Sequence, residues 1–109
     1  MIRHVVTFAL KPGVPDEKIR QVEADLAQLP GLIPQLLDYQ FGHDLGLYPT
    51  NGGFAATAVV ANPEDIALYM DHPEHVRISR EVLGPLVEHK LAVQFEIDSL
   101  PDTTPRSAS

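Results

Sequence analysis

The sequence predicts an α+β fold in which the elements follow the order strand, helix, strand, strand, helix, strand (βαββαβ). Four stretches alternate with the strand period of two or are continuously apolar, and two longer stretches repeat apolar residues at helical spacing. Clusters of proline and glycine separate these stretches, as is typical of turns. A chain of 109 residues has the length of one domain. This order predicts the ferredoxin-like arrangement, a four-stranded antiparallel sheet with the helices on one face.

The four strands are expected at residues 2–10, 36–42, 54–61 and 91–98. In the first strand, His4 shares a face with Val6 and Phe8, and we expect this apolar face to pack on the helices. The third strand is small and apolar throughout, as is typical of a strand that is covered on both faces. The sheet should therefore place a histidine in the core.

The helices have clear start and stop signals. The first should begin near Pro15, which suits the first turn of a helix, and end at Pro30-Gly31. Asn62 and Pro63 predict the start of the second, as an N-cap residue followed by a proline. This helix should end at His72, because a residue that precedes proline avoids the α region.

After this break the chain should become helical again. Pro73 is expected to open a further helix that runs to about residue 83. Gly84-Pro85 then interrupts it, and residues 86–89 are expected to form a last helical turn before the fourth strand.

A sheet with helices on one face leaves the other face open. We expect Val5 and Ala9 on this open face, together with the side of the fourth strand that carries Ala92 and Gln94. Four strands of this length leave a considerable apolar area uncovered. Pairing two such sheets would cover it, so the sequence predicts a homodimer.

Composition excludes several classes of function. The net charge of −7 and the scattered basic residues argue against nucleic acid and membrane surfaces as partners. The chain contains no cysteine, so disulfides and thiolate metal sites are excluded. No signal peptide and no apolar run of membrane-spanning length are visible, and we expect a cytoplasmic protein. Residues 1–99 should form the domain, and residues 100–109, which offer no core-forming side chains after Leu100, a disordered tail.

One short stretch concentrates groups that can move protons near neutral pH. Tyr69, His72 and His75 lie within seven residues, beside the helix-breaking Pro73. His4 and Tyr69 should both face the space between sheet and helices, where they could meet. This stretch is the candidate site.

The same stretch carries a resemblance to a known family. Tyr69-Met-Asp-His-Pro-Glu-His75, the opening Ile2-Arg-His-Val-Val6 and the later Pro30-Gly-Leu-Ile-Pro34 resemble the stress-responsive dimeric α/β-barrel (Dabb) family. The resemblance extends in the right order over about residues 1–98. It implies a ferredoxin-like homodimer whose two sheets close into a barrel.

The resemblance also implies a candidate chemistry. The family includes a plant polyketide (olivetolic acid) cyclase, whose acid–base residues match His4, Tyr69 and His75, whereas His72 and Pro73 match a structural part of the motif. These matches imply a pocket for a small apolar carbonyl compound and cofactor-free, polyketide cyclase-like chemistry. There are two alternatives. One is a non-catalytic stress or ligand-binding dimer, and the other is a cofactor-independent monooxygenase of the same fold.

Each of these residues also has a purely structural interpretation. His4 could be a hydrogen-bonded core histidine, and His72 should cap or brace the helix break, with its ring bonding a backbone carbonyl. The positive end of the following helix should lower the pKa of His75, which would suit either a general base or an inert cap. A metal site of His72 and His75 with Asp71 or Glu74 is a weaker hypothesis, and we expect neither metal nor cofactor.

Overall fold

The computed structural model describes residues 1–100, and the tail expected at residues 100–109 lies outside this range except for Leu100. Its elements are β1 (Ile2–Leu10), α1 (Asp16–Leu26), α2 (Leu29–Leu32), β2 (Asp38–His43), β3 (Phe54–Val60), α3 (Glu64–Met70), α4 (Pro73–Arg77), a π-helical segment (Ile78–Leu83), a 3₁₀ turn (Gly84–Leu86) and β4 (Val87–Glu96). The predicted βαββαβ order is confirmed. Within the described range, none of the helices is long and apolar enough to span a membrane.

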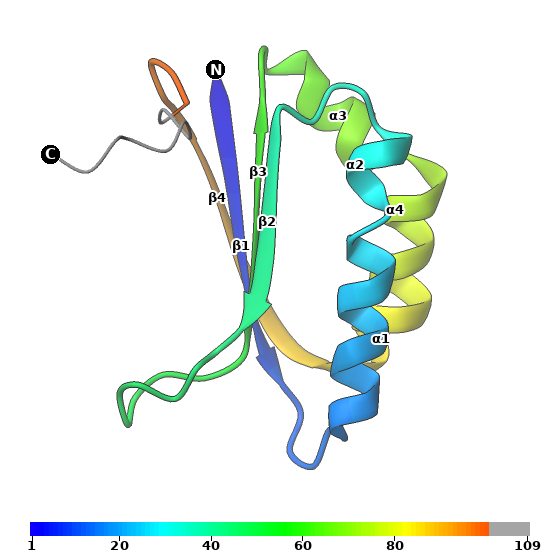
Figure 1. Cartoon of the computed structure of the whole chain (residues 1–109), viewed down its shortest axis with the longest axis vertical. Helices are drawn as coiled ribbons and strands as arrows, with labels where there is room; N and C mark the ends of the chain where they lie inside the picture. The colour runs from blue at the N-terminus through cyan, green and yellow to red at the C-terminus, as the bar shows by residue number, and fades with distance from the viewer. Residues whose placement is uncertain (101–109) are drawn as a thin grey trace, which may run out of the picture.

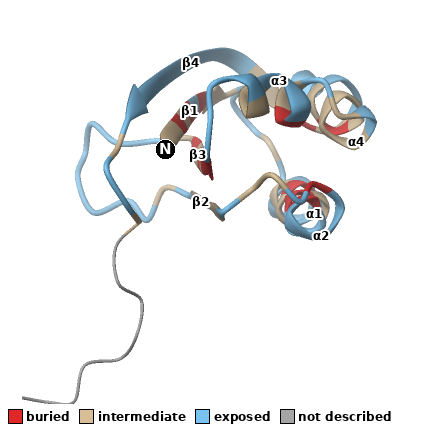
Figure 2. Cartoon of the chain, turned by 90° about the horizontal axis from the view of Figure 1, so that it is seen from above, coloured by how far each residue is buried: buried red, intermediate tan, exposed pale blue. Residues whose placement is uncertain are grey.

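The four strands form one antiparallel sheet in the order β2-β3-β1-β4. All helices lie on one side of this sheet, as Figures 1 and 2 show. This is the predicted ferredoxin-like arrangement. The central strand β1 pairs with β3 on one side and β4 on the other, so its inward side chains lie at the middle of the core.

The core fills the space between the sheet and the helices. Its buried side chains come mainly from β1, β3, α1 and the helical run after Pro73. One expected boundary differs: Pro30-Gly31 does not end helical structure but lies within the turn α2. Proline is tolerated there because it occupies the first turn of a helix, where its missing N–H is not needed. Leu29 and Ile33, which are fully buried, anchor this turn on the core.

The last strand begins earlier than the sequence predicts. Residues 87–89, expected in a helical turn, already belong to β4, whose first pair is Val87 with Leu10. A bulge at Ala9/Leu10 shifts the register, so Glu88 is an extra residue between two paired ones. Pairing with β1 therefore overrides the local turn signal of Gly84-Pro85.

The orientation of β4 is the main correction to the sequence-based fold. Gln94 pairs with His4 and Ala92 with Val6, so Ala92 and Gln94 face the helices. The prediction that they lie on the open side of the sheet is therefore wrong. The more apolar side of the strand faces outward and comprises Leu91, Val93 and Phe95, which are 70%, 52% and 47% exposed. Alternation defines the two faces of a strand but does not say which one meets the core. We call these three residues the outer β4 stripe.

The start of β3 depends on a glycine that no other residue can replace without strain. Gly53 has φ of +89°, and a Cβ atom there would collide with the carbonyl oxygen of Phe8 on β1. Gly53→Ala is therefore expected to lower the free energy of unfolding by about 2 kcal/mol or more in denaturant titrations. The control is Gly52→Ala, where a Cβ meets nothing within 4 Å. Equal stability of the two variants would contradict this prediction.

Candidate functional site

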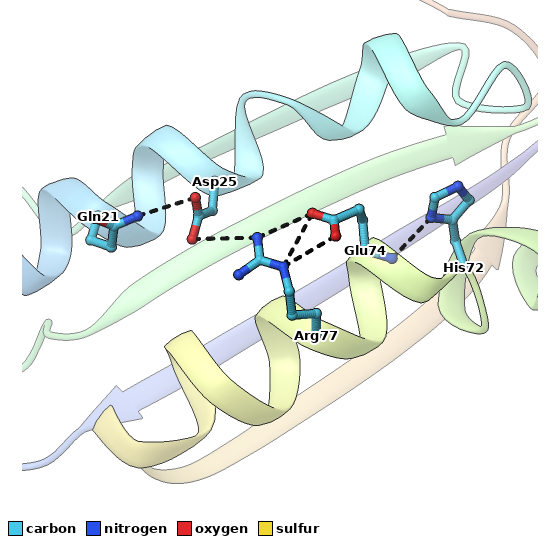
Figure 3. Close-up of polar contacts among 5 residues, drawn as sticks. All are labelled: Gln21, Asp25, His72, Glu74 and Arg77. Carbon is cyan, nitrogen blue, oxygen red and sulfur yellow. Dashed lines mark hydrogen bonds and ion pairs between the residues drawn. The ribbon is translucent and has the colours of Figure 1, made fainter.

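The break between α3 and α4 places the candidate residues. α3 ends at Met70, and His72 takes an extended conformation (φ −59°, ψ 134°), as the following proline requires. The His72 ring caps α4 by accepting a hydrogen bond from the Glu74 backbone N–H at 3.1 Å (Figure 3). The expected bond to a backbone carbonyl is not what forms. Capping leaves His72 outside the cavity described below.

An ion-pair network fixes α4 against α1. Arg77 donates to both carboxylate oxygens of Glu74 at 3.1–3.2 Å and lies 3.8 Å from the Asp25 carboxylate on α1 (Figure 3). Gln21 donates to the other oxygen of Asp25 at 3.1 Å. The network joins α1 to α4, and so holds the helix that carries His75 in place.

His75 is held in one tautomer. Its Nδ1 lies 3.0 Å from the Met70 carbonyl oxygen, which can only accept, so Nδ1 carries the proton. Nε2 is then left as a proton acceptor. Burial lowers the pKa of His75, and the Met70 carbonyl opposes this shift only in part. The pKa is thus lowered, as the sequence predicts, and burial is the largest cause among those resolved.

His4 has the complementary arrangement. It is 3% exposed, and the side-chain amide nitrogen of Gln94 donates to its Nδ1 at 2.7 Å. A neutral His4 ring must then carry its proton on Nε2, which makes Nε2 a donor. Burial lowers the pKa of His4, and the neighbouring His75 and Lys90 lower it further. One imidazole of the pair therefore offers a donor and the other an acceptor.

Tyr69 packs between the two histidines. Its ring centroid lies 5.9 Å from that of His4 and 4.5 Å from that of His75. Burial raises the pKa of Tyr69 and, more strongly, that of Tyr39 on β2, whose ring centroid is 6.0 Å away, so both phenols keep their protons. The hydroxyls are close enough to affect each other's pKa, but the buried Tyr39 oxygen has no partner in hydrogen-bonding geometry within the described chain.

A cavity of about 230 Å³ opens between β1, β4 and the helical run after Pro73. His4 and His75 both line it, together with apolar side chains such as Val6, Phe8 and Leu83. Tyr69 does not line this cavity. It lines an adjoining void of about 20 Å³, which shares His75 and several apolar side chains with the main cavity. The structure thus brings all three candidate residues together, with Tyr69 at the deep end.

The outer wall of the cavity is an irregular helix. The run that begins at Pro73 changes to π-helical geometry over Ile78–Leu83, where Ser79 and Leu83 line the cavity. A Cβ at Gly84 would lie 2.8 Å from the Ser79 carbonyl oxygen, so this glycine permits the turn to close. π-Helical turns often occur at functional sites. No pattern in the sequence predicted this one.

Three further polar groups at the site were not predicted. Gln94 orients His4, Tyr39 adds a second phenol, and Lys90 lines the cavity. The pairing register of β4 and β2 with the central strands places these three groups at the site. A single sequence does not reveal that register. The hypothetical metal site is not assembled, since nowhere in residues 1–100 do three or more histidine, aspartate or glutamate side chains gather as metal ligands.

Comparisons with known proteins agree with this description. A family model described as the Stress responsive A/B Barrel Domain matches residues 2–97. The stress-response A/B barrel domain-containing protein HS1 of Arabidopsis thaliana is 29% identical over 87 residues, which are 78% of this chain and 80% of HS1.

Solved structures give the same fold. A dimeric ferredoxin-like protein of unknown function from Thermobifida fusca is 35% identical, with a TM-score of 0.81 over 88% of this chain and 90% of its own. A hydroxynitrile lyase from Passiflora edulis shares the fold at 21% identity, with a TM-score of 0.74 over 92% of this chain and 96% of its own.

Proposed function

This chain belongs to the stress-responsive A/B barrel domain family, and from this premise we propose that it catalyses cofactor-free acid–base chemistry on a small, largely apolar carbonyl compound. One observation carries the proposal. His4 and His75 line the same apolar cavity, and the hydrogen bonds at their Nδ1 atoms leave Nε2 of His75 as a proton acceptor and Nε2 of His4 as a proton donor. A core histidine with a purely structural role does not need a cavity beside it.

The chemistry would begin with proton abstraction. Nε2 of His75 takes a proton from the carbon next to a carbonyl group, and the electron pair of that C–H bond moves onto the carbonyl oxygen as an enolate. His75 suits this step because burial keeps it neutral and the Met70 carbonyl can stabilise the imidazolium that forms.

The enolate oxygen needs hydrogen-bond donors in a site with little water. Nε2–H of His4 is one such donor, and the Tyr69 hydroxyl, at the deep end, is the second. The buried hydroxyl of Tyr39, which lines the same small void as Tyr69 and has no partner in hydrogen-bonding geometry within residues 1–100, adds a further polar group at this end of the site. A carbonyl compound is therefore a better match to the site than a hydrocarbon.

The homodimer belongs to the same proposal. The outer β4 stripe is exposed in the single chain, and the Thermobifida fusca relative is described as dimeric. Packing the open faces of two sheets together would cover the stripe and close the α/β barrel. The cavity lies on the helix side of each sheet, so each protomer would keep its own site.

Heptane-2,4,6-trione is a suitable neutral probe for the proposed chemistry. Removal of a proton from a terminal methyl carbon allows that carbon to attack the distant carbonyl, and loss of one water gives 5-methylresorcinol. In D₂O, the protein is expected to accelerate deuterium uptake at the terminal methyl groups, followed by NMR, even where ring closure is slow.

Ala92→Phe is the variant that connects this activity to the cavity. Ala92 is an exposed residue of β4 that lines the cavity, so a phenyl ring there should block the cavity without entering the core. We expect deuterium uptake to fall about tenfold or more in this variant. If wild type and Ala92→Phe exchange deuterium at the same rate, acid–base catalysis in this cavity is wrong, and a ligand-binding dimer without catalysis becomes the better interpretation.

A further inference from the structure

Among the described residues that line the cavity, the one permanently charged side chain is basic. The basic side chains His4, His75 and Lys90 line it, whereas no aspartate or glutamate does. His89 also lines it, although its pairing with Ala9 and the alternation of the strand direct its ring to the other face of β4. This is unexpected in a chain with 15 acidic and only 8 basic residues outside histidine. The cavity is therefore built for a ligand that is not positively charged.

Lys90 is the permanent charge among these groups. It pairs with Phe8, whose side chain is buried under the helices, so Lys90 also projects to the cavity side of the sheet. It is exposed overall, which places its ammonium group toward solvent at the mouth. Within residues 1–100 no carboxylate lies within 4.0 Å of it, as is also true of every other lysine and arginine in this range except Arg77.

We propose that Lys90 is an anion-binding residue at the mouth of the cavity, and that the natural ligand is a keto acid whose carboxylate binds Lys90 while its carbonyl lies deeper, between His4 and His75. This inference rests on the proposed function and adds the substrate class to it. The apolar wall between mouth and deep end, which includes Val6 and Leu83, would hold the carbon chain.

The electrostatics of the site agree with this placement. Lys90 is near enough to lower the pKa of both His4 and His75. Asp71, at the end of α3, raises that of His75 but does not line the cavity. A bound carboxylate would therefore offset the effect of Lys90 and strengthen His75 as a base only when substrate is present.

A carboxylate is a better match than a phosphate. A phosphate group carries more charge and usually meets several donors, such as paired arginines or consecutive backbone N–H groups. The cavity offers one ammonium group and no arginine. A single lysine at an open mouth is sufficient for one carboxylate.

The test uses two probes that differ only in charge, 4-oxooctanoate and its methyl ester. Dissociation constants are measured at pH 8, where both histidines are neutral, from NMR shifts of the His4 and His75 ring protons. Wild type should bind the acid about fivefold more tightly than the ester. Lys90→Met should remove this preference without changing ester binding, and Lys90→Arg should keep it. Lys18→Met, an equal charge change on exposed α1, is the matched control and should behave as wild type.

The other outcomes separate this inference from the proposed function. Equal binding of acid and ester by wild type would overturn the anion site, while deuterium uptake by the neutral triketone would still test the acid–base chemistry by itself. A preference for the acid that survives in Lys90→Met would overturn the assignment to Lys90. If inorganic phosphate competes with 4-oxooctanoate more strongly than acetate does, the proposed carboxylate ligand is wrong and the site binds a phosphorylated ligand.

Discussion

Replacing His75 with alanine should slow deuterium uptake by the triketone by about a hundredfold or more, because the variant loses the proton acceptor that the Met70 carbonyl holds in the required tautomer. The remaining groups, His4 and Tyr69, would still bind the carbonyl oxygen as donors. We therefore expect His75→Ala to exchange deuterium into the bound triketone more slowly, while its affinity for the triketone is retained.

Two further measurements would separate catalysis by His75 from a structural role. Free imidazole added to His75→Ala should restore part of the rate, because it can enter the space left by the missing ring. His43→Ala, which removes an exposed histidine outside the cavity, should leave the rate unchanged. If His75→Ala keeps its full rate while remaining folded, another group is the base.

The pH dependence should follow from the same residue. Burial lowers the pKa of His75 below its ordinary value of 6.5, so the neutral, active form persists below that pH. The wild-type rate should be constant near pH 7 and fall as the pH falls through this lowered pKa, where His75 becomes protonated. In His75→Ala this fall should disappear.

Val93→Asp should convert the protein from a dimer to a monomer. Val93 lies at the centre of the outer β4 stripe, opposite Val5 on β1, so it would be buried when two open faces pack together. Because of the two-fold symmetry, each substitution introduces two aspartates into one interface, and burying an unpaired carboxylate is costly. We expect the dissociation constant of the dimer to rise about 100-fold or more.

The mass in solution, measured by light scattering over a dilution series, reads out this change. Leu68→Asp is the matched control: Leu68 is 53% exposed, against 52% for Val93, but it lies on α3, on the other side of the sheet. This control should remain a dimer. A wild-type protein that is a monomer throughout the series, or a Val93→Asp variant that is still a dimer, would show that the stripe is not the interface.

Much of the fold was readable from local patterns. Pro63 and Pro73 marked helix starts, the His72-Pro73 break lay where expected, and the apolar face of β1 with His4 met the helices. These features depend on interactions between residues close in sequence, such as the missing N–H of proline and the alternation of a strand. Local chemistry alone is enough to specify them.

The sequence predicted the site only in part, because the contacts that complete the site join residues far apart in the chain. The resemblance to the family singled out His4, Tyr69 and His75 as one acid–base site, but not the partners that set the tautomers of the two histidines. Gln94 meets His4 across 90 positions of the chain, and the face that β4 turns inward is set by its pairing with β1. A shift of one residue would exchange Ala92, Gln94 and the outer stripe between core and surface.

Sequence alone therefore determined the order of the elements, the break at His72 and the residue types capable of acid–base chemistry. The tertiary structure decided which nitrogen of each histidine carries its proton, that Tyr69 packs against both rings but lines only the adjoining void, and that Lys90 lines the main cavity. The physical reason is that protonation and charge depend on burial and on contacts between distant strands and helices. These quantities exist only once the sheet has its register and the helices cover it.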